Sequence, residues 1–255
     1  MRTTSMLCLL GGLFIALQVL APIARCQEAS PLPQEILERV DEVLNAPKDQ
    51  TQDMDLQLID KNGSERIRSL KMWQKGDDMR TVKFLAPADV RNIGFLSLPD
   101  DVMYLYLPAF KKVRRIAAHV KNQKFAGTDF TYDDMGSMKY AEDYDARLVE
   151  ESEEMYMLEL KPKEGVEKDY RRLKMLVQKA SFYPTRIEYY DHGDNLWKVM
   201  ERREVSQIEG YWTSSEIEMQ DLKIEHRTIM LLSKITFDTG LSDAMFTERF
   251  LQRRP

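Results

Sequence analysis

Short runs in which apolar and polar residues alternate constrain the fold of this chain more than any other feature of its sequence. Met54, Leu56 and Leu58 alternate with polar neighbours, and a side-chain period of two is typical of a strand with one buried face. Turn-forming residues at 61–63 and 76–78 follow at the spacing of hairpins. The first half of the chain is therefore predicted to be an antiparallel meander.

The same alternation continues through the second half of the chain. Its apolar positions are Tyr156, Leu158, Leu160, Leu173, Met175, Val177, Ile187, Tyr189, Trp197 and Val199, followed by Ile229, Leu231, Ile235 and Phe237 in the last predicted strand. Turn residues at 163–165 and 191–195 separate several of these runs. Between Met219 and Leu222 the apolar positions change parity, which predicts a β-bulge at Gln220-Asp221.

Two helices are predicted outside this alternating pattern. Near the beginning of the chain, one apolar stripe at helical spacing consists of Ile36, Leu37, Val40, Val43 and Leu44. Asn45 and Pro47 end this helix, and a short terminal helix carries Phe246 and Phe250. Because no linker or repeat interrupts the pattern, residues 34–255 are predicted to form one antiparallel domain, preceded by a tether at residues 27–33.

Residues 1–26 have the pattern of a secretory signal peptide. A basic residue, Arg2, precedes an apolar run from Met6 to Leu20 that is short for a membrane span. Ala24 and Cys26 are small residues at the positions that signal peptidase requires, which predicts export and cleavage after Cys26. The alternative is a lipid-anchored form acylated at Cys26, but Arg25 is a poor residue for the position before such a cysteine.

Composition and motifs argue against nucleic-acid binding and against catalysis. The chain has a net charge of −5, which does not suit a nucleic-acid-binding protein. It lacks the nucleophile and metal motifs of hydrolases. Its three histidines, His119, His192 and His226, are scattered, and we interpret them as surface residues. The sequence thus predicts no enzyme, no metal and no cofactor.

The middle of the chain differs from its surroundings. Residues 102–107 are apolar at odd and even positions alike, so both faces of that predicted strand are expected to be buried. Residues 117–137, in contrast, show neither a strand-like nor a helical period of apolar residues. A long non-periodic segment within a compact domain is usually functional. Three carboxylates in this segment, Asp129, Asp133 and Asp134, lack the spacing of a calcium-binding loop, so we expect them to cap a helix start.

Four motifs of this middle region belong together. They are Gly94-Phe95-Leu96, Tyr104-x-Tyr106-Leu107-Pro108, Val113-Arg114-Arg115-Ile116 and Phe125-x-Gly127-x-Asp129-Phe130-Thr131-Tyr132-Asp133-Asp134. This set resembles the signature of the LolA-like outer-membrane lipoprotein-sorting family. The chain departs mildly from that signature where the family tends to have Met-Gly-Ser and this sequence has Ala126-Gly127-Thr128.

The resemblance implies a mainly β fold of the LolA/LolB type, an open (incomplete) antiparallel β-barrel around an apolar cavity, with short helices forming a lid. It also implies a location in the periplasm and a non-enzymatic carrier that moves lipids or lipoprotein acyl chains toward the outer membrane. The alternative within the same fold is an adaptor or lipid-sensing partner of an inner-membrane transporter. Either role involves transient contact with a membrane.

On this hypothesis, aromatic side chains of the signature region are the candidates for lipid binding. They are Tyr104, Tyr106, Phe110, Phe125, Phe130 and Tyr132. Arg114 and Arg115 belong to the densest basic group of the chain, which runs from Lys111 to Lys124, and are candidates for contact with lipid head groups or an acidic partner. The alternative for this basic group is a solvated hairpin.

Overall fold

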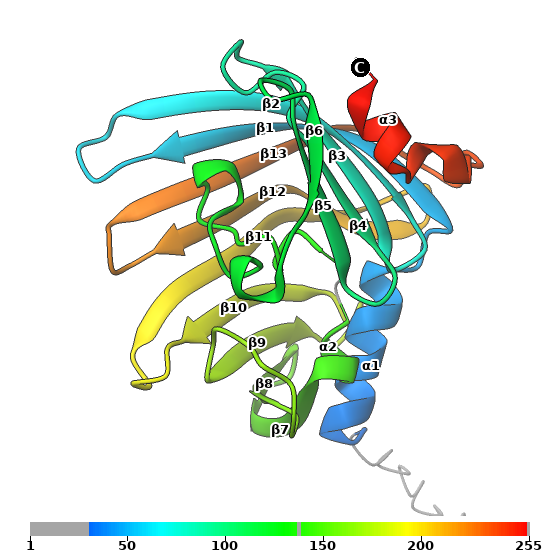
Figure 1. Cartoon of the computed structure of the whole chain (residues 1–255). Coiled ribbons are helices and arrows are strands. Elements are labelled where there is room, and N and C mark those ends of the chain that lie inside the picture. Colours follow the sequence, from blue (N-terminus) through cyan, green and yellow to red (C-terminus); the bar gives the residue numbers. More distant parts are fainter. Residues whose placement is uncertain (1–30, 137–138, 254–255) are drawn as a thin grey trace, which may run out of the picture. The chain divides into compact units, whose positions relative to one another are not determined.

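Thirteen strands form one antiparallel sheet in the computed structural model, which describes residues 31–136 and 139–253 (Figure 1). The strands are β1 (Asp49–Ile59), β2 (Glu65–Lys75), β3 (Met79–Ala86), β4 (Gly94–Leu98), β5 (Val102–Leu107), β6 (Lys112–Arg115), β7 (Tyr144–Glu151), β8 (Met155–Pro162), β9 (Arg172–Gln178), β10 (Pro184–Tyr190), β11 (Leu196–Ile208), β12 (Tyr211–Asp221) and β13 (His226–Phe237). The predicted signal peptide, residues 1–26, and most of the tether lie outside the described residues.

The strand order explains why the sheet stays open. β1 and β13 pair with each other in the middle of the sheet, and from there the order runs through β2–β5 to β6 on one side and through β12–β8 to β7 on the other. The consecutive strands β6 and β7 are therefore the two free edges, and they do not pair. The prediction of a mainly β, open antiparallel fold is confirmed.

The chain between the two edges covers the concave side of the sheet. We call residues 116–136 the crossing segment; it contains two 3₁₀ turns, Ala118–Val120 and Phe125–Gly127, and is green in Figure 1. Its Phe125 and Phe130 are buried in the same core cluster as Leu56 of β1 and Phe84 of β3. The non-periodic residues therefore complete the core of the open sheet.

Helices α1 (Pro33–Leu44) and α2 (Tyr140–Asp143) pack against each other and against β7 on the same side of the sheet. Ile36, Leu37 and Val40 of α1 are fully buried, which confirms the predicted apolar stripe. The Gln34 side chain donates to the backbone oxygens of Ala141 (3.2 Å) and Tyr144 (3.3 Å). Together with the crossing segment, α1 and α2 cover the open sheet.

Helix α3 (Glu248–Gln252) follows the 3₁₀ turn Asp243–Met245 and covers the other face of β4, β5 and β6. Phe246 and Leu251 form a second buried cluster with Trp73 of β2 and Leu96 of β4. The predicted terminal helix is therefore present, with Phe246 just before it and Phe250 within it.

The alternation predicted for most strands is confirmed, with β8, β9 and most of β1 and β10 burying every second residue. The prediction is wrong for β13 and only partly right for β11. In β13 the buried positions are Thr228 and Met230 rather than Ile229 and Leu231. In β11, Lys198 and Met200 are the direct partners of the buried Tyr189 and Ile187 of β10, so they share the concave face. Val199 is buried as predicted, and Trp197 packs beside Tyr170 where the register of β10 and β11 shifts.

The predicted β-bulge at Gln220-Asp221 is also wrong. β12 and β13 keep one register up to the pair Asp221 and His226. The strand ends at Asp221, and Leu222 and Ile224 lie exposed in the turn that follows. A change of parity in the sequence here marks the end of a strand and not an extra residue within it.

Candidate functional site

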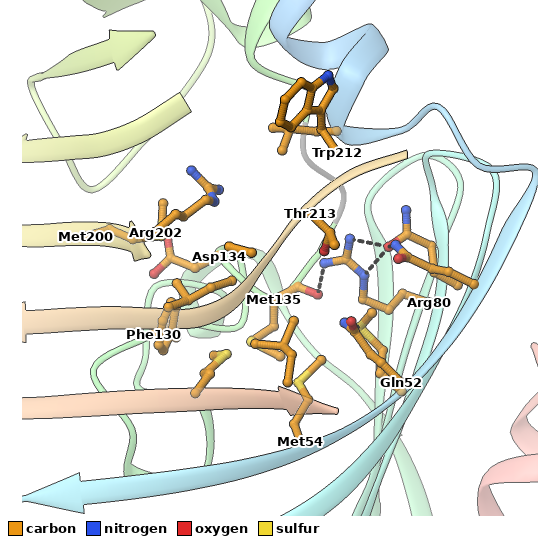
Figure 2. Close-up of a pocket in the computed structure, with 18 of the residues that line it drawn as sticks. Gln52, Met54, Arg80, Phe130, Asp134, Met135, Met200, Arg202, Trp212 and Thr213 are labelled. Carbon is orange, nitrogen blue, oxygen red and sulfur yellow. Dashed lines mark hydrogen bonds between the residues drawn. The ribbon is translucent and has the colours of Figure 1, made fainter. Parts of the chain in front are cut away.

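A cavity of about 140 Å³ lies on the concave side, between the sheet, the C-terminal end of α1 and the crossing segment (Figure 2). Residues of β1–β3 form one wall and residues of β11–β13 form the other, and Phe130, Asp134 and Met135 of the crossing segment close the cavity between them. A buried water needs only about 10–15 Å³. The space is therefore much larger than a buried water needs and is similar to cavities that hold a small apolar molecule.

The cavity wall is mainly apolar and unusually rich in methionine. Five buried methionines line it, namely Met54, Met72, Met135, Met200 and Met230. Aromatic side chains add Phe130, Tyr140, Tyr183, Tyr189, Trp212 and Phe237. The unbranched, polarisable thioether side chain adapts to irregular shapes, so this wall suits an apolar ligand of variable structure.

A row of polar side chains crosses the wall formed by β1, β2 and β3. Gln50 pairs with Gln74 across β1 and β2, and Gln74 pairs with Arg80 across β2 and β3, so the three side chains project from one face. Gln74 Oε1 accepts hydrogen bonds from Gln50 Nε2 (3.0 Å) and from Arg80 Nε (3.2 Å) and Nη2 (2.7 Å). We call these three residues the polar row.

Arg80 brings a positive charge into this wall. Its side chain is only 5% exposed, and Nη1 donates to the backbone oxygens of Met135 (3.0 Å) and Gly136 (2.5 Å), as the dashed lines in Figure 2 show in part. Burial lowers the pKa of Arg80 to about 10, so the guanidinium remains charged at neutral pH. Arg80 thereby also ties the end of the crossing segment to β3.

Further charged groups line the cavity on the side of β11. Arg202 donates from Nη1 to the backbone oxygen of Pro184 (3.2 Å), and its guanidinium carbon lies 5.9 Å from the centre of the Tyr183 ring. Asp134 Oδ2 accepts from the backbone nitrogen of Thr131 (2.7 Å). Burial raises the pKa of Asp134, which opposes its ionisation.

Asp129 fastens the middle of the crossing segment to the sheet. Its carboxylate is fully buried and contacts His226 Nδ1 (2.6 Å), Thr228 Oγ1 (2.8 Å) and Lys124 Nζ (3.0 Å). Lys198 Nζ donates to the Asp129 backbone oxygen (2.8 Å). Two predictions are therefore wrong: Asp129 does not cap a helix, and His226 is not a surface residue.

The other two carboxylates of this segment also make contacts that differ from helix capping. Asp133 Oδ2 lies 3.0 Å from Lys168 Nζ. Asp134 and Thr131 bind each other's backbone nitrogen through their side chains, at 2.7 and 3.0 Å, within a turn. All three aspartates stabilise the crossing segment and not a helix.

Within the described parts of the chain, no group of three or more His, Cys, Asp or Glu residues is arranged to hold a metal ion. None of the helices described has both the length and the apolar character needed to cross a membrane. The cavity is therefore the feature that points to a function.

Comparisons with known proteins agree with this fold. A model for a family described as an uncharacterized protein matches residues 76–253. A DUF1329 family protein from Desulfovibrio piger is 29% identical, with a TM-score of 0.81 over 87% of this chain and 100% of that chain. An outer membrane lipoprotein-sorting protein domain from Vibrio parahaemolyticus is 27% identical, with a TM-score of 0.75 over 85% and 98% of the two chains.

A LolA superfamily protein from Nitrosomonas europaea has the same fold, with a TM-score of 0.72 over 87% of this chain and 100% of that chain, at 21% identity. The chain belongs to the family of the model that matches it, and the predicted resemblance to LolA-like lipoprotein-sorting proteins is confirmed by these solved structures. Among curated proteins, no sequence matches it.

The LolA-like signature is spread over several parts of the fold. Of the six aromatic candidates for lipid binding, Phe130 lines the cavity and the other five do not. Phe125 and Tyr132 pack in the core against Phe84 and Phe95, with ring centres 5.5 to 6.0 Å apart. Their role in the described structure is to hold the crossing segment against the sheet.

The three remaining aromatic candidates lie away from the cavity. Tyr106 is buried in the cluster beneath α3, and Tyr104 packs against that cluster. Phe110 is 65% exposed in the turn between β5 and β6. The structure therefore does not bring the six residues of the LolA-like signature to one surface, and their contact with lipid stays a prediction.

The basic group of the signature is divided as well. We call its exposed part the basic hairpin; it consists of Phe110, Lys111, Lys112, Arg114 and Arg115 at the free edge of the sheet. Lys121 instead pairs with Asp101 (3.4 Å), and Lys124 pairs with Asp129 (3.0 Å). Arg114 and Arg115 thus remain available to a partner, whereas these two lysines are engaged within the fold.

The sequence prediction missed the polar row and Arg202. The available signal was parity: Gln74 lies two residues after the inward-facing Met72, and Arg80 lies two residues before the inward-facing Val82. Polar residues at core-facing positions need a partner, because they would otherwise be buried at a cost. They therefore indicate either the wall of a cavity, as in the polar row, or contacts with another segment, as for His226 and Lys198.

Proposed function

We propose that this protein is a periplasmic, non-enzymatic carrier that binds lipids or lipoprotein acyl chains and moves them toward the outer membrane. The observation that carries the proposal is the cavity with its wall of five methionines. An acyl chain gains about 0.8 kcal/mol for each CH₂ group taken out of water. Such binding works by burial alone, without any bond being made or broken, and without a cofactor.

The rim of the cavity suggests how a ligand enters. Leu44 at the end of α1, together with Trp212 and Thr213 of β12, lines the cavity and is partly exposed. By contrast, the crossing segment is anchored through the fully buried Asp129. Entry past α1 therefore requires less rearrangement than entry through the crossing segment.

Native mass spectrometry of the protein purified from the periplasm tests this proposal. A co-purifying lipid that extraction removes, and that added lipid replaces, supports the carrier. The control is a variant with a filled cavity, which should carry less lipid. A protein that is free of lipid after gentle purification and that takes up no amphiphile afterwards would contradict the proposal.

A second candidate function is an adaptor for an inner-membrane transporter. The basic hairpin favours this function. Its exposed Phe110 is followed by four basic residues at a free edge of the sheet, and such a surface suits an acidic partner or a membrane. The same purification separates the candidates. A stoichiometric protein partner with an empty cavity favours the adaptor over the carrier.

The location also belongs to this proposal. We expect export with cleavage after Cys26, so that a tether of residues 27–33 precedes one domain of residues 34–255. Intact mass spectrometry of the exported protein tests the cleavage site, because the mass should be that of a chain that begins at Gln27. An acylated Cys26 would instead make the protein a membrane-anchored acceptor.

A further inference from the structure

The polar row has more hydrogen-bond donors than acceptors. Gln74 Oε1 accepts three hydrogen bonds, from Gln50 Nε2 and from Arg80 Nε and Nη2, although an amide oxygen has two lone pairs. The Gln74 amide nitrogen donates away from the row, to the backbone oxygen of Gly76 (3.0 Å). A further acceptor at this place would relieve the crowding on Gln74 Oε1.

The charge of the polar row is also uncompensated. Arg80 donates to Gln74, to Met135 and to Gly136, and all these acceptors are neutral. Among the described residues, no carboxylate lies within 4.0 Å of its guanidinium. Burying a charge without an opposite charge is costly, even when its hydrogen bonds are made. A ligand that carries a negative charge would remove this cost.

The surroundings decide what kind of anion fits. The polar row lies in the same wall as Met54 and Met72, and the opposite wall adds Met200, Met230 and the second guanidinium, that of Arg202. A small hydrated anion would leave the methionines without a partner. An anionic group on a long alkyl chain would satisfy both parts of the cavity.

Asp134 lines the same cavity and is the one carboxylate that faces it among the described residues. It does not pair with Arg80, because no ion pair within 4.0 Å joins the two side chains, and its Oδ2 accepts from the backbone nitrogen of Thr131. The positive charge of Arg80 is therefore not neutralised by any carboxylate of the described cavity wall.

From this geometry we infer that the cavity selects an amphiphile with an anionic head group, and that Gln50, Gln74 and Arg80 bind the head-group oxygens while the methionines bind the chain. The inference rests on the proposed carrier function and names the chemical class of its ligand. The shared chemistry is an oxyanion on a long alkyl chain, either a carboxylate or a phosphodiester. Charged oxygens accept stronger hydrogen bonds from a guanidinium than neutral ones do.

The test compares ligands that differ in their head group. The delipidated full-length mature protein is titrated with oleate, with oleoyl-lysophosphatidylglycerol and with oleyl alcohol, each below its aggregation concentration, in competition with a fluorescent fatty-acyl probe. We expect both anions, or one of them, to bind at least about tenfold tighter than the alcohol. A preference for one anion assigns the head group to a carboxylate or to a phosphodiester.

Gln74→Glu tests the role of the polar row with little change of shape. It places a carboxylate beside Arg80 that neutralises the guanidinium and repels an anion, so it should abolish the preference for anions and leave binding of oleyl alcohol within about twofold. The matched control is Gln57→Glu, which makes the same change on the other face of β1. It should leave both affinities unchanged.

The outcomes separate the two proposals. If no amphiphile binds, the carrier function fails, and this inference falls with it. If the alcohol binds as tightly as the anions, the carrier function stands but Arg80 has only its structural role with Met135 and Gly136. The same conclusion follows if folded Gln74→Glu keeps the preference for anions.

Discussion

The carboxylate of Asp129 lies 2.6 Å from Nδ1 of His226, although the two residues are 97 positions apart in the sequence. Asp129 belongs to the crossing segment, and His226 is the first residue of β13, in the middle of the sheet. Thr228, on the same face of β13, donates to the same carboxylate. This cluster determines how the crossing segment lies over the concave face.

Replacement of Asp129 should destabilise the fold strongly. Asp129→Ala leaves the buried His226 and Thr228 without their acceptor, and each buried polar group left unsatisfied typically costs about 1–3 kcal/mol. Lys124 keeps its second partner, Asp221 (3.3 Å). Urea unfolding followed by tryptophan fluorescence measures this loss. The control is Asp89→Ala, an exposed change that should stay within about 0.5 kcal/mol. A loss below 1 kcal/mol for Asp129→Ala would mean that the cluster does not hold the segment.

Much of the fold could be predicted because apolar residues recur at a period of two through β8 and β9 and through most of β1 and β10. The parity signal failed where polar residues face inward. In β13 the inward positions include His226 and Thr228, which bind Asp129. In β11 they include Lys198, which binds the backbone of the crossing segment. A local pattern cannot show contacts with residues 70 to 100 positions away.

The candidate site was harder to predict than the fold. The family signature drew attention to aromatic residues near the crossing segment, and most of these hold that segment in place. The polar row depends on register, because Gln50, Gln74 and Arg80 meet only when β1, β2 and β3 pair as they do. Hydrophobic periodicity specifies which face a residue takes, but not which residues of neighbouring strands lie opposite one another.

The pH dependence of stability should contain a contribution from Asp41. Its carboxylate accepts from the backbone nitrogens of Tyr140 (3.0 Å) and Ala141 (2.7 Å), and burial, with smaller effects of Asp143 and Glu142, raises its pKa from 3.8 to about 6. Between these two pH values the folded state binds more protons than the unfolded state, so stability falls as the pH rises.

Asp41→Asn removes this titration. The free energy of unfolding of the wild type, minus that of Asp41→Asn, should therefore decrease by about 1–2 kcal/mol between pH 4 and pH 7, after allowance for partial solvent exposure. Denaturant unfolding of both proteins at matched pH values provides the measurement. Two stability curves that run parallel across this range would show that Asp41 ionises in the folded state as it does in the unfolded state.

Filling the cavity should reduce lipid binding without a change of charge. Met230→Trp places a large side chain into the cavity from β13, and such overpacking typically costs about 1–3 kcal/mol of stability. Uptake of a fluorescent fatty-acyl probe should fall at least about tenfold, equally at low and high salt. The matched control is Ile229→Trp, the neighbouring position on the other face of the strand. Normal uptake by folded Met230→Trp would place the lipid outside this cavity.

The basic hairpin should act in delivery and not in binding. It lies at the free edge formed by β6, and Arg114 and Arg115 are exposed there beside Lys112. The side chains that line the cavity come from other strands. Its contribution should therefore appear only when the protein meets a membrane, and it should be electrostatic.

Replacing Arg114 and Arg115 together with glutamate should slow lipid transfer to anionic vesicles several-fold at about 0.05 M salt and much less at about 0.5 M, because exposed charges are screened over shorter distances as salt increases. Transfer is measured as loss of quenching of a fluorescent lipid. Binding of the same lipid in solution should not change. The control, Lys61→Glu with Arg66→Glu in the exposed β1–β2 hairpin, alters the net charge equally and should have a smaller effect. Equal defects in both double variants would indicate a general effect of net charge and would rule out a specific role for the basic hairpin.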